Sequence, residues 1–173
     1  MRVALFATIL FIYSTLGLVR PLSNWLRDHN LLRLAVGISF ALAATAMAWL
    51  IFRDPRNRAP KVVASLIVIA GLYGAAILPM SSPEEKIHFI EYGVVALLAE
   101  GSAPQRWSAT KKYLGAALFV LAAGWGDELI QALLPSRYYD LRDVAFNAAA
   151  GVIALVALAA VRFSRRETPA PAV

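Results

Sequence analysis

Residues 113–163 read YLGAALFVLAAGWGDELIQALLPSRYYDLRDVAFNAAAGVIALVALAAVRF, and two apolar runs in this stretch flank a short polar turn. The runs cover residues 113–134 and 141–163. Each is close to the roughly 20 residues with which an α-helix crosses the hydrocarbon core of a bilayer. The turn contains Pro135 and is long enough only to join two neighbouring, antiparallel helices. The stretch therefore predicts a membrane hairpin with ionisable residues inside both of its arms.

Four more apolar runs precede this hairpin, at residues 3–19, 31–52, 62–80 and 83–99. The chain of 173 residues is 60% hydrophobic and 16% charged, whereas a soluble domain carries about 25% charged residues. We expect the first run to be a retained helix rather than a cleaved signal, because no small-x-small cleavage site follows it. The sequence thus predicts an all-α fold, a polytopic transmembrane helical bundle of about six helices. It would form one domain over residues 1–163, with a disordered cytoplasmic tail at 164–173.

The distribution of Lys and Arg predicts the orientation of this bundle. With the N-terminus in the cytoplasm, the cytoplasmic segments hold eleven of the 17 Lys and Arg residues and the outer segments hold six. The positive-inside rule therefore places both termini in the cytoplasm. The formal charge of +6 and the pI of about 10.0 arise in these short loops, so they do not indicate a nucleic-acid surface. The absence of cysteine excludes disulfides, thiolate metal sites and Cys nucleophiles.

Two segments near the predicted outer face carry local signals. Residues 21–33 fit a short interfacial helix or a plain loop equally well. Asp140 stands directly before the last apolar run. A carboxylate in this position accepts hydrogen bonds from the first free backbone N–H groups of a helix. We therefore expect Asp140 to cap the last helix.

The polar residues inside the runs are confined to the C-terminal half of the chain, and the first three helices are predicted to be apolar scaffold. Residues three or four apart share a helix face, so the polar positions form a stripe on each of the last three helices. The neighbours Asp127 and Glu128 are turned by about 100° and need not face the same partner. The candidate ligand-binding residues are Lys86, His88, Glu91, Tyr92, Asp127, Glu128, Gln131, Arg137, Asp140, Asp143 and Asn147.

These candidates lie at one depth in the predicted bilayer. At about 1.5 Å per residue, His88 lies roughly 8 Å and Glu91 roughly 12 Å below the start of their helix. Asp127 lies roughly 12 Å above the end of its helix by the same measure, and a half-core is about 15 Å. A charge there costs about 2.5–3.5 kcal/mol, so the groups should face the bundle interior and mark a functional site. The alternative is a structural network, in which Lys86 snorkels to the interface and Asn147 joins helices.

The order of the polar residues over 80–160 resembles the VanZ-like family of bacterial integral membrane proteins. The first motif is Glu85-Lys86-x-His88-Phe89-x-x-Tyr92. The second is Asp127-Glu128-x-x-Gln131-x-x-x-Pro135-x-Arg137-x-x-Asp140-x-x-Asp143-x-x-x-Asn147-x-x-x-Gly151. Ser136 and Leu155 stand where the family often has glycine. The resemblance implies a bacterial cytoplasmic (inner) membrane protein with a role in the cell envelope, and the namesake is linked to low-level resistance to the glycopeptide teicoplanin.

The function that we favour is a binding module at the extracytoplasmic leaflet for the headgroup of an envelope lipid or a lipid-linked cell-wall precursor. Lys86, Arg137 and Arg142 would meet phosphate. The carboxylates and Gln131 would meet a sugar, an amine or a bridging cation. Membrane lipids are thus the expected partners, and no cofactor, resident metal or nucleic acid is expected.

Three other functions fit the same residues. A membrane enzyme would use His88 and Glu91 as an acid–base pair, with Asp127, Glu128 and Asp143 around a divalent cation. However, the sequence has no HExxH, GxSxG or phosphate-binding glycine loop. A transporter would use an unwound helix near Asp127. An accessory subunit of a larger membrane protein complex would dock through its lipid-facing helices.

Overall fold

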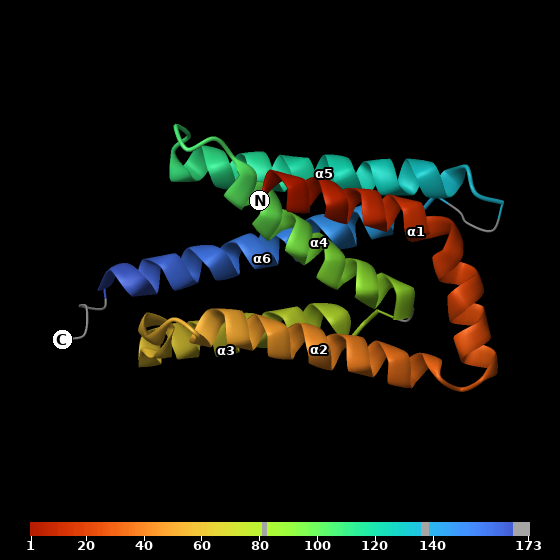
Figure 1. Ribbon diagram of the computed structural model, residues 1–173, viewed down its shortest axis with the longest axis horizontal. Helices are drawn as coiled ribbons and strands as arrows, with labels where there is room; N and C mark the ends of the chain where they lie inside the picture. The colour runs from red at the N-terminus through yellow and green to blue at the C-terminus, as the bar shows by residue number, and fades with distance from the viewer. Residues whose placement is uncertain (81–82, 136–138, 168–173) are drawn as a thin grey trace.

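A computed structural model describes residues 1–80, 83–135 and 139–167 (Figure 1). This part of the chain contains helices and no strand, which confirms the predicted all-α class. The elements are α1 (Arg2–Asp28), α2 (Leu32–Phe52), the short 3-10 helix η1 (Pro55–Arg58), α3 (Pro60–Ile77), α4 (Pro83–Ser102), α5 (Ala109–Ala132) and α6 (Leu141–Glu167). The predicted Arg137 and parts of the predicted tail lie outside the described residues.

Four of the described helices are long and apolar enough to cross a membrane, namely α2, α3, α5 and α6. The two limbs of α1 add a fifth candidate if they count as one broken span. The remaining helix, α4, does not meet the same criterion because its first turns carry several charged residues. The hydropathy of the chain is therefore that of a membrane protein, with one central helix that is more polar than the others.

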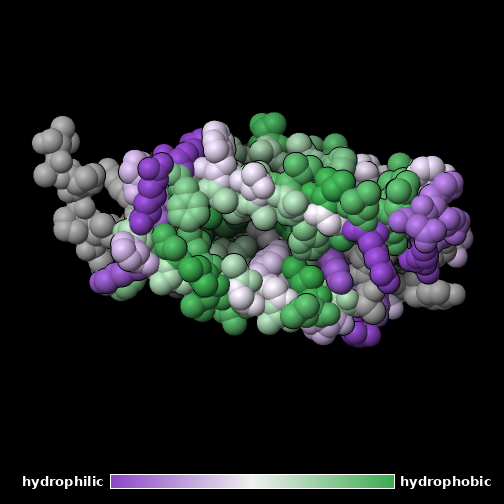
Figure 2. Space-filling model, turned by 90° about the horizontal axis from the view of Figure 1, so that it is seen from below, coloured by the Kyte–Doolittle hydropathy of each residue, from purple (hydrophilic) through white to green (hydrophobic). Residues whose placement is uncertain are grey.

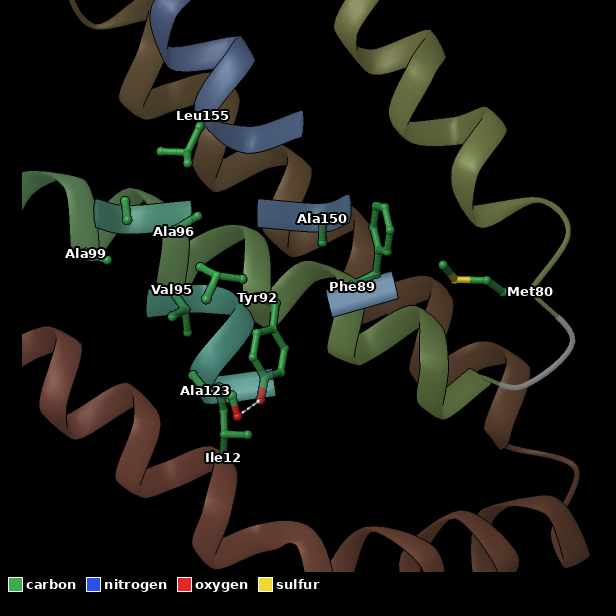
Figure 3. Packing of buried hydrophobic residues seen from close by; sticks show 12 residues of the cluster. Ile12, Met80, Phe89, Tyr92, Val95, Ala96, Ala99, Ala123, Ala150 and Leu155 are labelled. Carbon is green, nitrogen blue, oxygen red and sulfur yellow. Dashed lines mark hydrogen bonds between the residues drawn. The ribbon is translucent and has the colours of Figure 1, made fainter. Parts of the chain in front are cut away.

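Helix α4 lies at the centre of the bundle, and Figure 1 shows it crossing diagonally between the other helices. It packs directly against α1, α2, α5 and α6. Its apolar residues at positions 89, 92, 95, 96 and 99 recur every three or four residues and are buried (Figure 3). Because both the apolar and the polar faces of α4 are covered by protein, its charged residues do not have to face lipid.

Helices α2 and α3 form a peripheral hairpin. Only 6% of the apolar window of each is buried, compared with 33% in α5 and 28% in α6. Tyr73 attaches α3 to the core, because its hydroxyl donates to the Phe89 carbonyl at 2.6 Å and its ring packs edge-on against Phe89. Figure 2 shows hydrophobic surface across the middle of the molecule and hydrophilic residues gathered toward the ends. The exposed side chains of α2 and α3 are therefore suited to contact with lipid.

Helix α1 is bent by 56° between Arg2–Leu18 and Arg20–Asp28. Pro21 explains the bend, since proline has no N–H to donate to the Gly17 carbonyl and its ring crowds that carbonyl. The second limb runs across the end of the bundle toward α2 (Figure 1). Of the two alternatives for residues 21–33, the helix is therefore correct for the part up to Asp28.

The C-terminal helix is longer than the sequence predicted. The disordered tail was expected from residue 164, but α6 continues to Glu167. Nothing in Ser164-Arg165-Arg166 opposes a helix, whereas Pro169 disfavours helical backbone in the residue before it. Residues 168–173 lie outside the described part of the chain.

Close packing joins α5 to α6 at Gly151. A Cβ atom on Gly151 would lie 2.8 Å from Cγ1 and 3.2 Å from Cγ2 of Val120. Val120 is itself fully buried, and Leu155 is buried one turn after Gly151. The larger residue at position 155 is therefore accommodated in the core, whereas Gly151 occupies the point of closest approach.

We predict that Gly151→Ala lowers the stability of the folded protein by about 1–3 kcal/mol, because Val120 is β-branched and cannot move away freely. Gly71→Ala is the matched control, since a Cβ atom there has nothing within 4 Å. It should leave the melting temperature unchanged or raise it slightly. Thermal unfolding of both variants in the same detergent measures the difference. Equal melting temperatures would contradict the close approach of α5 and α6.

Candidate functional site

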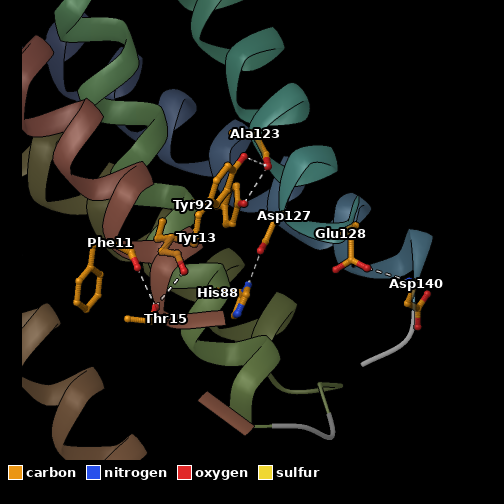
Figure 4. A network of polar contacts seen from close by, with 10 residues as sticks. Phe11, Tyr13, Thr15, His88, Tyr92, Ala123, Asp127, Glu128 and Asp140 are labelled. Atoms are coloured by element: carbon orange, nitrogen blue, oxygen red, sulfur yellow. Dashed lines mark hydrogen bonds and ion pairs between the residues drawn. The ribbon is translucent and has the colours of Figure 1, made fainter. Parts of the chain in front are cut away.

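The predicted polar stripes of α4 and α5 meet at one end of the bundle. Asp127 Oδ2 lies 3.1 Å from Nδ1 of His88, and the two residues are 0% and 9% exposed (Figure 4). Antiparallel packing causes this contact, because His88 lies near the start of α4 and Asp127 near the end of α5. A buried carboxylate at Nδ1 fixes the orientation of an imidazole ring and favours the proton on that nitrogen.

Two tyrosines close the site from the side of the bundle centre. The Tyr13 hydroxyl donates to the Ala123 carbonyl at 2.7 Å, and the Tyr92 hydroxyl donates to the same carbonyl at 3.2 Å (Figure 4). Gly126 makes room for Tyr13, because a Cβ atom there would lie 2.6 Å from the Tyr13 oxygen. Tyr92 was predicted and Tyr13 was not. No sequence signal singled out Tyr13, because the same run also contains Thr8, Ser14 and Thr15.

Asp127 and Glu128 point to different partners, as their 100° separation predicted (Figure 4). Oε2 of Glu128 accepts a hydrogen bond at 2.9 Å from the backbone N–H of Asp140. Oδ1 of Asp140 accepts one at 2.8 Å from the backbone N–H of Arg142, which confirms the predicted cap of α6. Glu128 thus holds the start of α6 against α5, while Asp127 pairs with His88 on α4.

The other predicted residues are divided between the core and the surface. Gln131 and Asn147 are 1% exposed, and Asn147 Nδ2 has no hydrogen-bond partner among the described residues. Arg142 extends over the Phe146 ring, 5.9 Å from its centroid. Lys86 and Asp143 are half-buried. In the described part of the chain, no group of three His, Asp or Glu side chains is arranged to hold a metal ion.

A cavity of about 230 Å³ lies beside the His88–Asp127 pair. Both limbs of α1 and the first turns of α2 and α4 enclose it. Its lining is mostly apolar and consists of Ile12, Thr15, Leu16, Leu22, Ser23, Leu26, Leu32, Ala35, Val36, Ser39, Ile87, His88 and Glu91. α1 and α2, which the sequence predicts to be apolar scaffold, thus supply most of the cavity lining, and local hydropathy does not reveal which apolar surfaces line a space.

No family model, curated protein or solved structure matches the chain. The cavity and the His88–Asp127 pair are therefore the observations from which a function can be inferred. The pair places a fixed imidazole in the cavity wall, and Glu91 adds a carboxylate one turn further along α4. Chemically, such a wall can hold a ligand by hydrogen bonds or exchange protons with it.

A second ionic cluster lies at the opposite end of α4 and was not predicted. Arg162 Nη1 contacts Glu100 Oε1 at 2.5 Å, and Arg162 Nη2 contacts Glu100 Oε2 at 3.0 Å. Nη1 also donates to the Tyr113 hydroxyl at 3.2 Å. Glu100 is 3% exposed. This bidentate pair ties α4 to α5 and α6.

We predict that Arg162→Ala lowers stability by about 2 kcal/mol, because it leaves a buried carboxylate without its counter-charge. The loss should be smaller than for an enclosed pair, since the Arg162 side chain is 48% exposed. Adding Glu100→Gln to Arg162→Ala should recover part of the melting temperature. A double variant less stable than Arg162→Ala would show that Glu100 does not depend on Arg162. Thermal unfolding in detergent measures all three proteins.

Proposed function

We propose that the chain is a VanZ-like protein of the bacterial inner membrane that binds the headgroup of an envelope lipid or a lipid-linked cell-wall precursor. In this proposal it crosses the membrane six times, with both termini in the cytoplasm. The observation that carries the proposal is the cavity of about 230 Å³ with an apolar lining and His88 and Glu91 in its wall. Such a combination suits an amphiphilic ligand, because one surface meets the apolar part and a few polar groups fix the orientation.

The central position of α4 supports six crossings. Although α4 carries charged residues, His88 and Glu100 on it are buried among other helices. A helix covered in this way can lie at membrane depth without exposing its polar side chains to hydrocarbon. The bend at Pro21 supports the same arrangement, since the first limb of α1 can span while the second limb lies along the interface.

The contacts between the two motifs support the VanZ-like assignment. His88 from the first motif pairs with Asp127 from the second, and Glu128 binds the backbone of Asp140 within the second. Residues that are far apart in the sequence thus form one connected site. Under the proposed orientation this site lies in the extracytoplasmic leaflet, where lipid-linked envelope precursors present their headgroups.

Single-cysteine labelling tests the orientation, and the chain has no native cysteine to interfere. Asp28 and Gln105 are exposed positions at opposite ends of the bundle. In intact cells, a membrane-impermeant maleimide should label Asp28→Cys and should not label Gln105→Cys. After permeabilisation both variants should react. Labelling of Gln105→Cys alone in intact cells would reverse the orientation, and labelling of both would contradict the proposed number of crossings.

Native mass spectrometry of the protein extracted gently from its own membrane tests the binding function. The wild type should carry a bound lipid or polyprenyl-linked species. Ala35→Phe should lose it, because Ala35 lines the cavity and the larger side chain fills that space. Ala41→Phe is the control, since Ala41 is exposed elsewhere on α2.

The three possible results for the Ala35→Phe and Ala41→Phe variants lead to different conclusions. Loss of the species in Ala35→Phe alone supports the cavity site. Equal lipid in both variants identifies surface-bound lipid and contradicts the proposal. A larger assembly with other membrane proteins and no bound lipid would favour an accessory subunit instead.

A further inference from the structure

The walls of the cavity are unbalanced in charge. Glu91 lines the cavity, and it lies within electrostatic range of His88 and Asp127. No Lys or Arg from the described part of the chain is among the lining residues. The ionisable groups of the lining are therefore one carboxylate and one imidazole, and with Glu91 ionised their net charge is negative or zero. Arg142, which the sequence predicted to bind phosphate, extends over Phe146 on α6 instead.

Two of the three hydroxyl side chains in the lining, Thr15 and Ser39, are placed to accept hydrogen bonds from a ligand. Thr15 donates to the carbonyls of Phe11 and Ile12, at 2.9 and 3.0 Å (Figure 4). Ser39 donates to the Ala35 carbonyl at 2.9 Å. The hydroxyl hydrogens of Thr15 and Ser39 are thus engaged within their own helices, so these two side chains offer a ligand oxygen lone pairs. The cavity is therefore better equipped to receive hydrogen-bond donors than to receive a phosphate or a carboxylate.

We propose that the cavity binds an organic ammonium group attached to an apolar body, with Glu91 as its counter-ion. This inference rests on the proposed binding function and specifies the ligand chemistry of the same cavity. A primary ammonium offers three donors and one positive charge. The donors suit the acceptors of Thr15 and Ser39, and the positive charge offsets that of Glu91 in a region where an uncompensated charge is costly.

The volume and the apolar lining of the cavity limit the length of the alkyl part of the ligand. A dry apolar cavity of about 150 Å³ holds benzene in another protein, so 230 Å³ accommodates a short alkyl chain with its ammonium group. The leucines of α1 and α2 would contact the alkyl portion. The same chemistry occurs in a lipid with a primary ammonium headgroup and in a free lipophilic amine. A phosphate of such a lipid would lie outside the cavity.

Calorimetric titration of the full-length protein in detergent tests the inference with three probes of equal length: hexylammonium, hexanol and hexanoate. Hexylammonium should bind at least about tenfold more tightly than hexanol, as expected for a hydrogen bond to a charged group. Hexanoate should bind least. Equal affinity for hexylammonium and hexanol would overturn the inference. This comparison uses only the wild type, so it does not depend on whether any variant folds.

Variants then locate the counter-ion. Glu91→Gln keeps the shape of the side chain and removes its charge, and it should abolish the preference for hexylammonium over hexanol. Asp28→Asn removes an exposed carboxylate on the second limb of α1 and should leave the preference unchanged. A preference that persists in Glu91→Gln would show that another group holds the ammonium, contrary to the proposal.

Competition experiments distinguish a lipid headgroup from a free amine as the source of the ammonium. They also test the headgroup function and the ammonium site separately. If nanodisc lipids with a primary ammonium headgroup displace hexylammonium and lipids with a glycerol headgroup do not, the source is a lipid. If neither competes, the source is a free amine, and the headgroup function fails while the ammonium site stands. If a native lipid is lost in Ala35→Phe but no ammonium preference exists, the headgroup function stands and the ammonium inference fails.

Discussion

The enclosure of a polar helix by more apolar ones is the constraint on which the rest of the structure depends. Helix α4 carries His88, Glu91 and Glu100 in a bundle whose other helices are largely hydrocarbon. Exposure of these groups to lipid would cost several kcal/mol. His88 and Glu100 are buried and have partners on neighbouring helices, Asp127 at one end and Arg162 at the other, whereas Glu91 lines the cavity. The His88 end of α4 borders the cavity of about 230 Å³ described above.

The helices could be predicted from the sequence because their length and hydropathy are local properties of the chain. The meeting of His88 with Asp127 could also be predicted, since helix rise places both residues at one depth and the turns place them in one leaflet. The cavity could not be predicted in this way, because α2 and both limbs of α1 are apolar and their sequences do not indicate which faces enclose a space. Glu100 and Arg162 were missed for a related reason, as their pairing depends on helix packing rather than on spacing along one helix.

The polar contacts at the two ends of α4 have different roles in the fold. At the end of α4 that carries Glu100, both carboxylate oxygens of Glu100 accept hydrogen bonds from Arg162, and Arg162 Nη1 also donates to the Tyr113 hydroxyl. At the other end, Glu128 and Asp140 secure the start of α6 by backbone hydrogen bonds, which leaves the neighbouring Asp127 to orient His88 toward the cavity wall. The hydrogen bonds of Glu128 and Asp140 thus hold α5 against α6, and the neighbouring Asp127 positions His88 in the cavity wall.

The loosely packed α2–α3 hairpin has a mechanical consequence for the cavity. Leu32, Ala35 and Val36 of α2 form part of the cavity wall, yet only 6% of the apolar window of this helix is buried inside the protein. A helix held in this way adjusts its tilt to the thickness of the bilayer. Because α2 supplies part of the cavity wall, a change in its tilt would change the width of the cavity.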